Sequence, residues 1–393
     1  MDRLNIFAPH VRANPYPHYA ELRRAAPVAQ IEPGGLWAVS RYDDIVSILK
    51  TPSVFSSQGL RAMTVQPWLE RNPTSDSVVV MDPPLHTKSR ALVAHAFSAR
   101  VIPRIEPLAR AVCTAFAARA REGVEMDICD ELSSTLPAAV IANLLGLDGG
   151  MVERFRVWSE DLVAINPGTP EAAQPRIRET ITELDRYLNE VLAARRLARR
   201  DDLVSDLLDA QIDGERLGDE EIVSFLFLLL IAGFETTTHL LTNSLRVLAD
   251  HPELVERLRA EPAAIPRFVE EVLRFDSPVQ GTMRLTLADV DVSGVRIPAG
   301  AVVLLLLGSA NRDERQFERP DQFDIDRTPR TNLSFGHGIH FCIGAALARI
   351  EARIALEELI PQIRGVRVTR EPTWNLAMTV RGPLTCRLKF LPA

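Results

Sequence analysis

Apolar residues recur at helical spacing along most of this chain. Other long stretches are rich in Ala, Leu, Arg and Glu, which favour helices. Together these patterns predict helices at 43–49, 86–97, 102–121, 134–145, 151–165, 175–199, 219–249, 266–275 and 345–359. The chain is therefore expected to be mainly α.

A smaller β portion is predicted from short runs that contain β-branched residues. The expected strands are 36–39, 290–292, 295–297, 301–306, 366–368 and 386–390. Gly34-Gly35 and 298–300 favour turns. Residues 55–80 follow neither pattern, and so long a loop in a compact domain is usually functional or mobile.

The helix 219–249 begins with acidic residues, which the helix dipole favours, and its middle is apolar all round, so we expect it in the core. An acid and a hydroxyl, Glu235 and Thr236, interrupt this apolar run and are costly there unless they have partners. Gly233 is a poor helix residue, and Thr236 can bond back to the carbonyl of Ala232. We therefore expect the helix to be weakened and opened here, which would admit water or dioxygen. A kink lined by satisfied polar groups is the alternative.

The composition is that of a globular protein, with 393 residues, 46% hydrophobic and 25% charged. A net charge of −7 and a pI of about 5.7 argue against nucleic acid as the main partner. No linker or repeat divides the chain, so we expect one domain over 1–393. Residues 1–20 lack the apolar core of a signal peptide, and the most apolar stretch, 225–234, is about half the length of a membrane span. We therefore expect a cytoplasmic protein without a membrane anchor.

One cysteine, Cys342, lies between a glycine-rich loop and the helix 345–359. A thiol at the positive end of a helix dipole favours the thiolate. Gly336, Gly338 and Gly344 leave room for a flat group to approach the backbone. A thiolate beside a flat cofactor suggests a haem iron with a cysteine ligand. A small buried cysteine in a turn is the plainer alternative.

The run from Phe335 to Gly344, Phe-Gly-His-Gly-Ile-His-Phe-Cys-Ile-Gly, resembles the haem-binding signature of the cytochromes P-450, the haem-thiolate monooxygenases. The resemblance reaches from about residue 14 to the C-terminus. It implies the cytochrome P-450 fold, with haem b between the long central helix and the helix after the cysteine loop. It further implies that Cys342 is the axial ligand of the iron, with Phe335 and Gly344 beside the cofactor.

The same resemblance assigns roles outside the cysteine loop. Glu235 and Thr236 match the oxygen-activation motif, so they are expected to help deliver protons to iron-bound dioxygen. Asp-Pro-Pro-x-His-x-x-x-Arg over 82–90 matches a family pattern in which the histidine and the arginine bind the haem propionates. The expected propionate donors are His86, Arg90, Arg284 and His340. A surface cation is the alternative for each of them.

Glu271 and Arg274 share a helix face at i, i+3 and match the Glu-x-x-Arg element of the family. Arg327 lies where the family supplies a second arginine to this pair. The three residues are expected to anchor the loop that leads to Cys342 and to take no part in catalysis.

The chain departs from the common family pattern at three positions. Glu314 stands where a proline is usual, Asn332 where a histidine often precedes the cysteine loop, and Glu235 where aspartate is more frequent. Glu235 keeps the negative charge, so proton delivery should survive. An acid there also argues against the peroxide-using members.

The resemblance places the substrate pocket on separated segments, with 60–68 as a lid. The expected lining residues are Leu228, Ile231, Ala232, Val279, Gln280, Met283, Met378 and Thr379. Most of these are apolar, which predicts a hydrophobic small-molecule substrate. Each could equally be an ordinary core residue.

No flavin or NADPH module is evident, so electrons are expected from a separate ferredoxin or flavodoxin with its reductase. Lys88, Arg349 and Arg353 are candidates for a basic docking patch, and a solvated charged face is the alternative. The expected reaction inserts one atom of dioxygen into the substrate, by hydroxylation or epoxidation. A peroxide-driven peroxygenase of the same fold and a non-enzymatic haem-based ligand sensor are the other readings.

Overall fold

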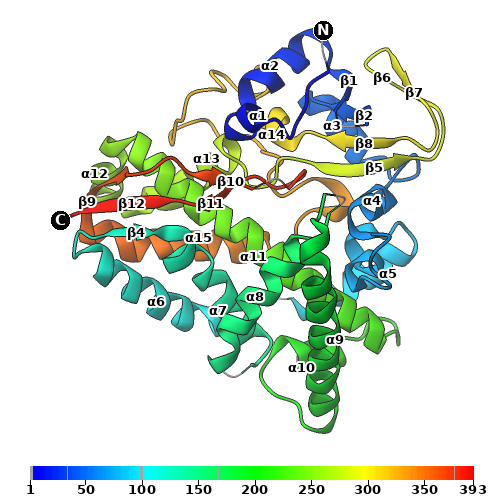
Figure 1. Cartoon of the computed structure of the whole chain (residues 1–393), viewed down its shortest axis with the longest axis horizontal. Coiled ribbons are helices and arrows are strands. Elements are labelled where there is room, and N and C mark those ends of the chain that lie inside the picture. Colours follow the sequence, from blue (N-terminus) through cyan, green and yellow to red (C-terminus); the bar gives the residue numbers. More distant parts are fainter. Residues whose placement is uncertain (1–2, 33, 98–100, 148, 167, 376) are drawn as a thin grey trace.

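A long helix, α11 (Asp219–Asp250), crosses the middle of the computed structural model (Figure 1). The structure describes residues 3–32, 34–97, 101–147, 149–166, 168–375 and 377–393. By length and composition α11 could span a membrane, but 72% of its apolar window is buried inside the protein. It is therefore a core helix, as its apolar middle predicts.

The other helices surround α11, and all the predicted helices are present with ends shifted by a few residues. They are α1 (Pro9–Ala13), α2 (Tyr16–Ala25), α3 (Tyr42–Leu49), α4 (Arg61–Thr64), α5 (Leu85–Ala96), α6 (Val101–Ala120), α7 (Thr135–Leu144), α8 (Val152–Val163), α9 (Gln174–Leu197), α10 (Leu203–Asp209), α12 (Pro252–Ala260), α13 (Ile265–Phe275), α14 (Leu307–Ala310) and α15 (Ala345–Leu359). Helix α9 shows why the pattern works. It buries Ile177, Ile181, Leu184, Leu188 and Leu192, which fall on one face.

The β portion is confirmed and larger than predicted. The main sheet has the order β1-β2-β8-β5-β3, from β1 (Val28–Ile31), β2 (Leu36–Val39), β8 (Val302–Leu305), β5 (Thr282–Thr286) and β3 (Phe55–Ser56). A second sheet joins β4 (Glu125–Asp127), β12 (Arg387–Pro392) and β9 (Ile363–Val368). Two separate two-stranded sheets complete the β portion: β6 (Val290–Val292) pairs with β7 (Val295–Ile297), and β10 (Thr373–Trp374) pairs with β11 (Pro383–Thr385).

Residues 55–80 hold only short elements, in line with the prediction of an irregular region. Apart from β3 and α4, the described part of this segment contains short 3₁₀ turns. Hydrogen bonds within the segment stabilise it: Asn72 Nδ2 donates to the Thr64 carbonyl (2.9 Å) and Arg61 donates to the Ser75 carbonyl (2.9 Å).

Two apolar clusters meet along α11. The first half of the helix, from Ile222 to Phe234, packs into one cluster with α8, α9 and α10. The second half, from Leu240 to Leu248, packs into the other with α6, α13 and α15. The polar residues Glu235 to His239 lie between the two, so the polar interruption seen in the sequence marks a boundary inside the core.

Candidate active site

The cysteine loop is held in shape by its glycines and by main-chain hydrogen bonds. Gly336 and Gly338 have φ of 72° and 73°, a region that non-glycine residues rarely adopt. A Cβ on Gly338 would also lie 2.7 Å from the Leu49 carbonyl oxygen. The N–H of Cys342 donates to the carbonyl of Phe335 (2.9 Å), and α15 begins three residues later. The loop therefore fixes the backbone from which the thiol projects.

In the protein alone, burial opposes the thiolate form of Cys342 that the helix dipole is expected to favour. Burial raises the pKa of Cys342, and this outweighs the hydrogen bond from the Gly344 N–H and the charges of Arg90 and Arg349. The residue has exposed surface, but that surface faces a cavity. A thiol in such a place becomes a stable thiolate when it coordinates a metal ion.

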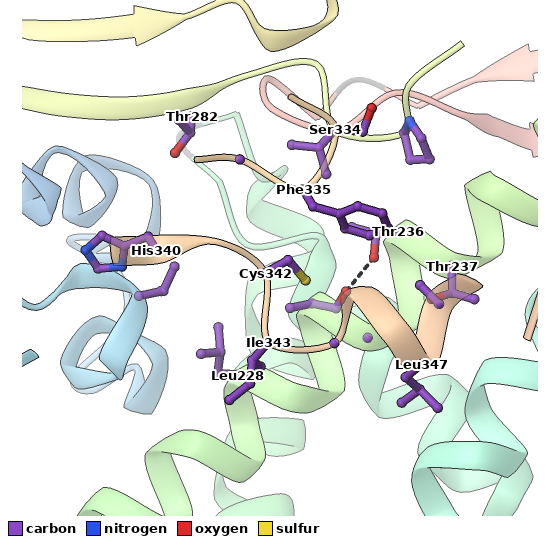
Figure 2. A pocket seen from close by; sticks show the side chains of 18 of the residues that line it. Leu228, Thr236, Thr237, Thr282, Ser334, Phe335, His340, Cys342, Ile343 and Leu347 are labelled. Carbon is purple, nitrogen blue, oxygen red and sulfur yellow. Dashed lines mark hydrogen bonds between the residues drawn. The ribbon is translucent and has the colours of Figure 1, made fainter. Parts of the chain in front are cut away.

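A mostly apolar cavity separates α11 from the cysteine loop and the start of α15 (Figure 2). About 1530 Å³ of it is free of protein atoms, part of which is open to solvent. The Cys342 sulfur and the Thr236 hydroxyl both face this space. Phe335 and Gly344 line it as well, as expected. An apolar space of this kind is typical of sites for small molecules and cofactors.

Four cationic or imidazole groups gather at one side of the cavity. Arg90, Arg284 and His340 line it, and the ring of His86 lies 4.2 Å from that of His340. Burial and then the neighbouring positive groups lower the pKa of His340 to about 3. Burial lowers the pKa of Arg284 to about 10 and also lowers the pKa of Arg90 and of His86.

The acid that acts on this group, Asp82, binds other partners, because its carboxylate accepts from Ser56 Oγ and from the Ser57 N–H (2.8 Å). His86 is 2% exposed, and neither of its ring nitrogens has a hydrogen-bond partner among the described residues. Glu351 is the one acid among the described residues that line the cavity. The site thus offers a metal-binding thiol, room for a flat group and donors for carboxylates, which fits haem with its two propionates.

Helix α11 is continuous through Gly233, so the opening that we expected there is absent. Thr236 does donate to the Ala232 carbonyl (2.6 Å), as predicted, without breaking the helix. Gly233 instead permits close packing, because a Cβ there would lie 3.2 Å from Ile141 Cδ1 of α7. Glu235 is not among the cavity-lining residues. Its Oε1 accepts from Asn375 Nδ2 (3.1 Å) and lies 3.6 Å from His239 Nε2.

The expected substrate-pocket residues divide into two groups. Leu228, Ala232 and Val279 line the cavity. The residues that do not line it are Ile231, Gln280, Met283, Met378 and Thr379. Gln280 faces the interior instead, where Nε2 donates to the Ser277 carbonyl (2.7 Å), and Met283 is 2% exposed in an apolar cluster. Both flank or lie in β5, a strand that the sequence pattern did not reveal. In the expected lid, Leu60 lines the cavity.

Glu271, Arg274 and Arg327 come together as an ion network. Arg274 binds both oxygens of Glu271 (2.7 and 2.8 Å), and Arg327 Nε donates to Oε1 (3.2 Å). Arg274 also donates to the carbonyl of Asn311 (2.9 Å). The side chain of Asn311 in turn bonds Ser334 Oγ (2.9 Å) and the Leu333 N–H (2.6 Å), directly before the cysteine loop. A physical link thus runs from the buried ion pair to that loop.

The unusual residues have local partners. Glu314 accepts from Arg23 Nε (3.1 Å), an arginine that is 1% exposed. Asn332 accepts from the Ser334 N–H (3.1 Å), so it closes a turn before the cysteine loop.

The three cations expected to form a basic docking patch are each paired with an acid. Lys88 lies 2.6 Å from Glu215, Arg349 binds Glu270, and Arg353 Nη1 lies 3.1 Å from Glu357. Arg349 also lies over the ring of Phe335 (4.4 Å). These charges are offset by their neighbours, so they do not form an unopposed positive surface.

Sequence reasoning passed over several residues of the site. The sequence pattern assigned no role to His239, although its i, i+4 spacing from Glu235 could have indicated the contact. Nothing in the sequence indicated that the site includes Asn375, Arg12 and Ser334, because their partners lie far away in the chain. Glu351 was also missed, since an acid within a charged helix such as α15 reads as solvent-exposed.

Comparisons with known proteins agree with this geometry. The family model described as Cytochrome P450 matches residues 159–364. The chain is 39% identical over 355 residues to the erythromycin C-12 hydroxylase of Saccharopolyspora erythraea, covering 89% of this chain and 87% of that protein. It resembles the structure of cytochrome P450 CYP109Q5 from Chondromyces apiculatus, at 40% identity and a TM-score of 0.92 over 100% and 99% of the two chains. It also resembles CYP109E1 from Bacillus megaterium in complex with testosterone, at 35% identity and a TM-score of 0.85 over 96% and 99%.

Proposed function

The chain belongs to the cytochrome P450 family, as a haem-thiolate monooxygenase, and from that premise we propose that Cys342 binds the iron and that the cavity above it receives a hydrophobic small molecule. The observation that carries the proposal is the Cys342 sulfur facing a largely apolar cavity whose opposite wall is α11. When bound, haem supplies the activation of dioxygen at its iron. The protein residues position the reactants and move protons.

His86, Arg90, Arg284 and His340 would hold the two propionates. Each is buried or lines the cavity, and the unpaired ring of His86 would gain a partner. Charged hydrogen bonds of this kind are strong when they are shielded from water. The same groups would hold the haem in one orientation. Glu271, Arg274 and Arg327 would act one layer further out, by holding the cysteine loop.

Thr236 and Glu235 would deliver protons to the dioxygen side of the haem. The Thr236 hydroxyl faces the cavity, and Glu235 lies behind it on the same helix. A hydroxyl can accept a proton from one side while it donates one on the other. The reaction takes up dioxygen, two electrons and two protons, and releases the oxygenated product and water.

The substrate would contact Leu228, Ala232 and Val279, with Leu60 at the edge of the cavity. An apolar surface of this kind favours ligands that bury hydrocarbon and carry few charges. The steroid complex of a similar protein is consistent with such a ligand. Hydroxylation of a C–H bond or epoxidation of a C=C bond would follow.

Electrons would come from a separate ferredoxin or flavodoxin with its reductase, and the protein would work in the cytoplasm. Because Lys88, Arg349 and Arg353 have acidic partners, docking would depend little on these charges.

The carbon monoxide spectrum of the reduced protein tests the proposal. Wild type should show a Soret band strongly shifted to the red relative to His-ligated haem, and Cys342→Ser should lose that shift. Cys386→Ser, at a buried cysteine that is not among the described residues lining the cavity, serves as the matched control. A wild-type spectrum of the His-ligated kind would contradict thiolate ligation. Turnover with hydrogen peroxide but not with a reductase system would favour the peroxygenase.

A further inference from the structure

Four residues from three parts of the chain form a buried polar cluster behind Thr236. Glu235 and His239 lie one turn apart on α11, Asn375 lies between β10 and β11, and Arg12 lies on α1. Asn375 Nδ2 lies 3.1 Å from Glu235 Oε1 and 3.3 Å from His239 Nε2. Arg12 donates to Asn375 Oδ1 (2.7 Å) and to the Asn375 carbonyl (3.1 Å). The cluster thus joins the catalytic helix to both chain ends.

The hydrogen bonds determine which way each group faces. A guanidinium can only donate, so the Asn375 amide oxygen must face Arg12, and its NH₂ group must face Glu235 and His239. The N–H of Gly382 also donates to this oxygen (3.3 Å). With the amide turned this way, His239 Nε2 accepts from Asn375 and lies 3.6 Å from the Glu235 carboxylate.

The imidazole has little freedom to leave this position. His239 is 4% exposed, and a Cβ on Gly382 would lie only 1.9 Å from its Nδ1. The ring therefore occupies the space that any side chain at position 382 would need. The Asn375 N–H donates to the Gly382 carbonyl (3.1 Å), which fixes the main chain that packs against the ring.

Other charged groups near the cluster have partners of their own. The Arg381 guanidinium binds Asp276 (2.6 Å) and the carbonyls of Arg12 (2.8 Å) and Ala13 (2.6 Å). The Glu235 carboxylate thus lies 3.6 Å from the His239 ring, with Arg12 on the far side of Asn375.

We propose that His239 is a positioning residue for Glu235: its Nε2 accepts from the Asn375 amide, and that amide holds the carboxylate in place behind Thr236. This inference rests on the proposed role of Glu235 and Thr236 in the monooxygenase. With the ring in place, the amide has one orientation and the carboxylate has one position. Without it, the carboxylate can move away from Thr236, and reduced dioxygen leaves as hydrogen peroxide, which takes up the same two electrons and two protons.

The test compares His239→Leu with wild type, using a substrate found from its spin-state shift and a surrogate ferredoxin system. Leu keeps the position buried but cannot accept from Asn375. The variant should bind haem and substrate as wild type does. Product formed per electron pair should fall at least severalfold, peroxide should rise to match, and the solvent deuterium isotope effect on turnover should increase.

Two further variants separate this role from a general disturbance of the helix. Gly382→Ala keeps the imidazole but displaces it, so it should reproduce the uncoupling. Ser244→Ala, buried on α11 beyond the cluster, should couple like wild type. Wild-type coupling and an unchanged isotope effect in both His239→Leu and Gly382→Ala would overturn the inference. The same result in Thr236→Ala would instead overturn the proposed proton delivery itself.

Discussion

Replacing Glu351 with Gln is expected to stabilise the protein near neutral pH. Glu351 lies on α15, is 2% exposed, and its Oε2 has no hydrogen-bond partner among the described residues. Burial raises the pKa of Glu351 from its ordinary 4.5 to about 8. The folded protein therefore keeps this carboxyl protonated at pH values where the unfolded chain ionises it.

Linkage gives the sign and the size of the effect. The stability that the raised pKa contributes is fully present below pH 4.5 and is lost as the pH rises through about 8. Each pH unit in that interval is worth about 1.4 kcal/mol. Between pH 4.5 and neutral pH this one group therefore lowers the free energy of unfolding by roughly 3 kcal/mol. Gln has no proton to lose, so the advantage of Glu351→Gln should grow with pH by a similar amount.

Urea unfolding of the holoprotein, followed by tryptophan fluorescence, measures this difference at about pH 5 and about pH 7.5. Differences between variant and wild type cancel the titration of all other groups. Glu256→Gln, at an exposed acid on α12, should show no pH-dependent difference. A gain for Glu351→Gln that is equal at both pH values would refute the argument, because the carboxyl would then not titrate differently in the two states.

Four other outcomes follow from the contacts. Glu271→Gln leaves buried Arg274 poorly paired, so thermal or urea unfolding should show a loss of about 3–5 kcal/mol and haem content should drop. His86→Phe keeps the ring contact with His340, so titration of the apoprotein with hemin should show weaker haem binding, whereas the apoprotein should be no less stable. Thr236→Ala should release most of its electrons as peroxide in a coupling assay while substrate binding is unchanged. Reduction by a ferredoxin, measured by stopped flow, should depend little on salt. A steep fall in the reduction rate as salt rises would instead support docking through the basic patch, since exposed charges are screened within roughly 8 Å at physiological ionic strength.

The sequence by itself determined the features that depend on local order. The spacing of Phe335, the glycines and Cys342 predicted the cysteine loop, and the helix after it begins and ends at Ala345 and Leu359 as expected. The apolar run of α11 predicted a core helix, and the bond from Thr236 to Ala232 spans only one turn. Such features can be read from sequence because a helix or a tight turn involves residues that are close in the chain.

Only the tertiary structure decided which distant groups meet and how deeply they are buried. The Glu235 carboxylate and the amide of Asn375 are 140 positions apart, and Arg12 and Asn375 are 363 apart. Strand β5 turned Gln280 and Met283 away from the cavity, and β4 joined strands from the end of the chain. Burial raised the pKa of Cys342 and gave Glu351 its high pKa. These outcomes depend on desolvation and long-range packing, which no periodicity in the sequence records.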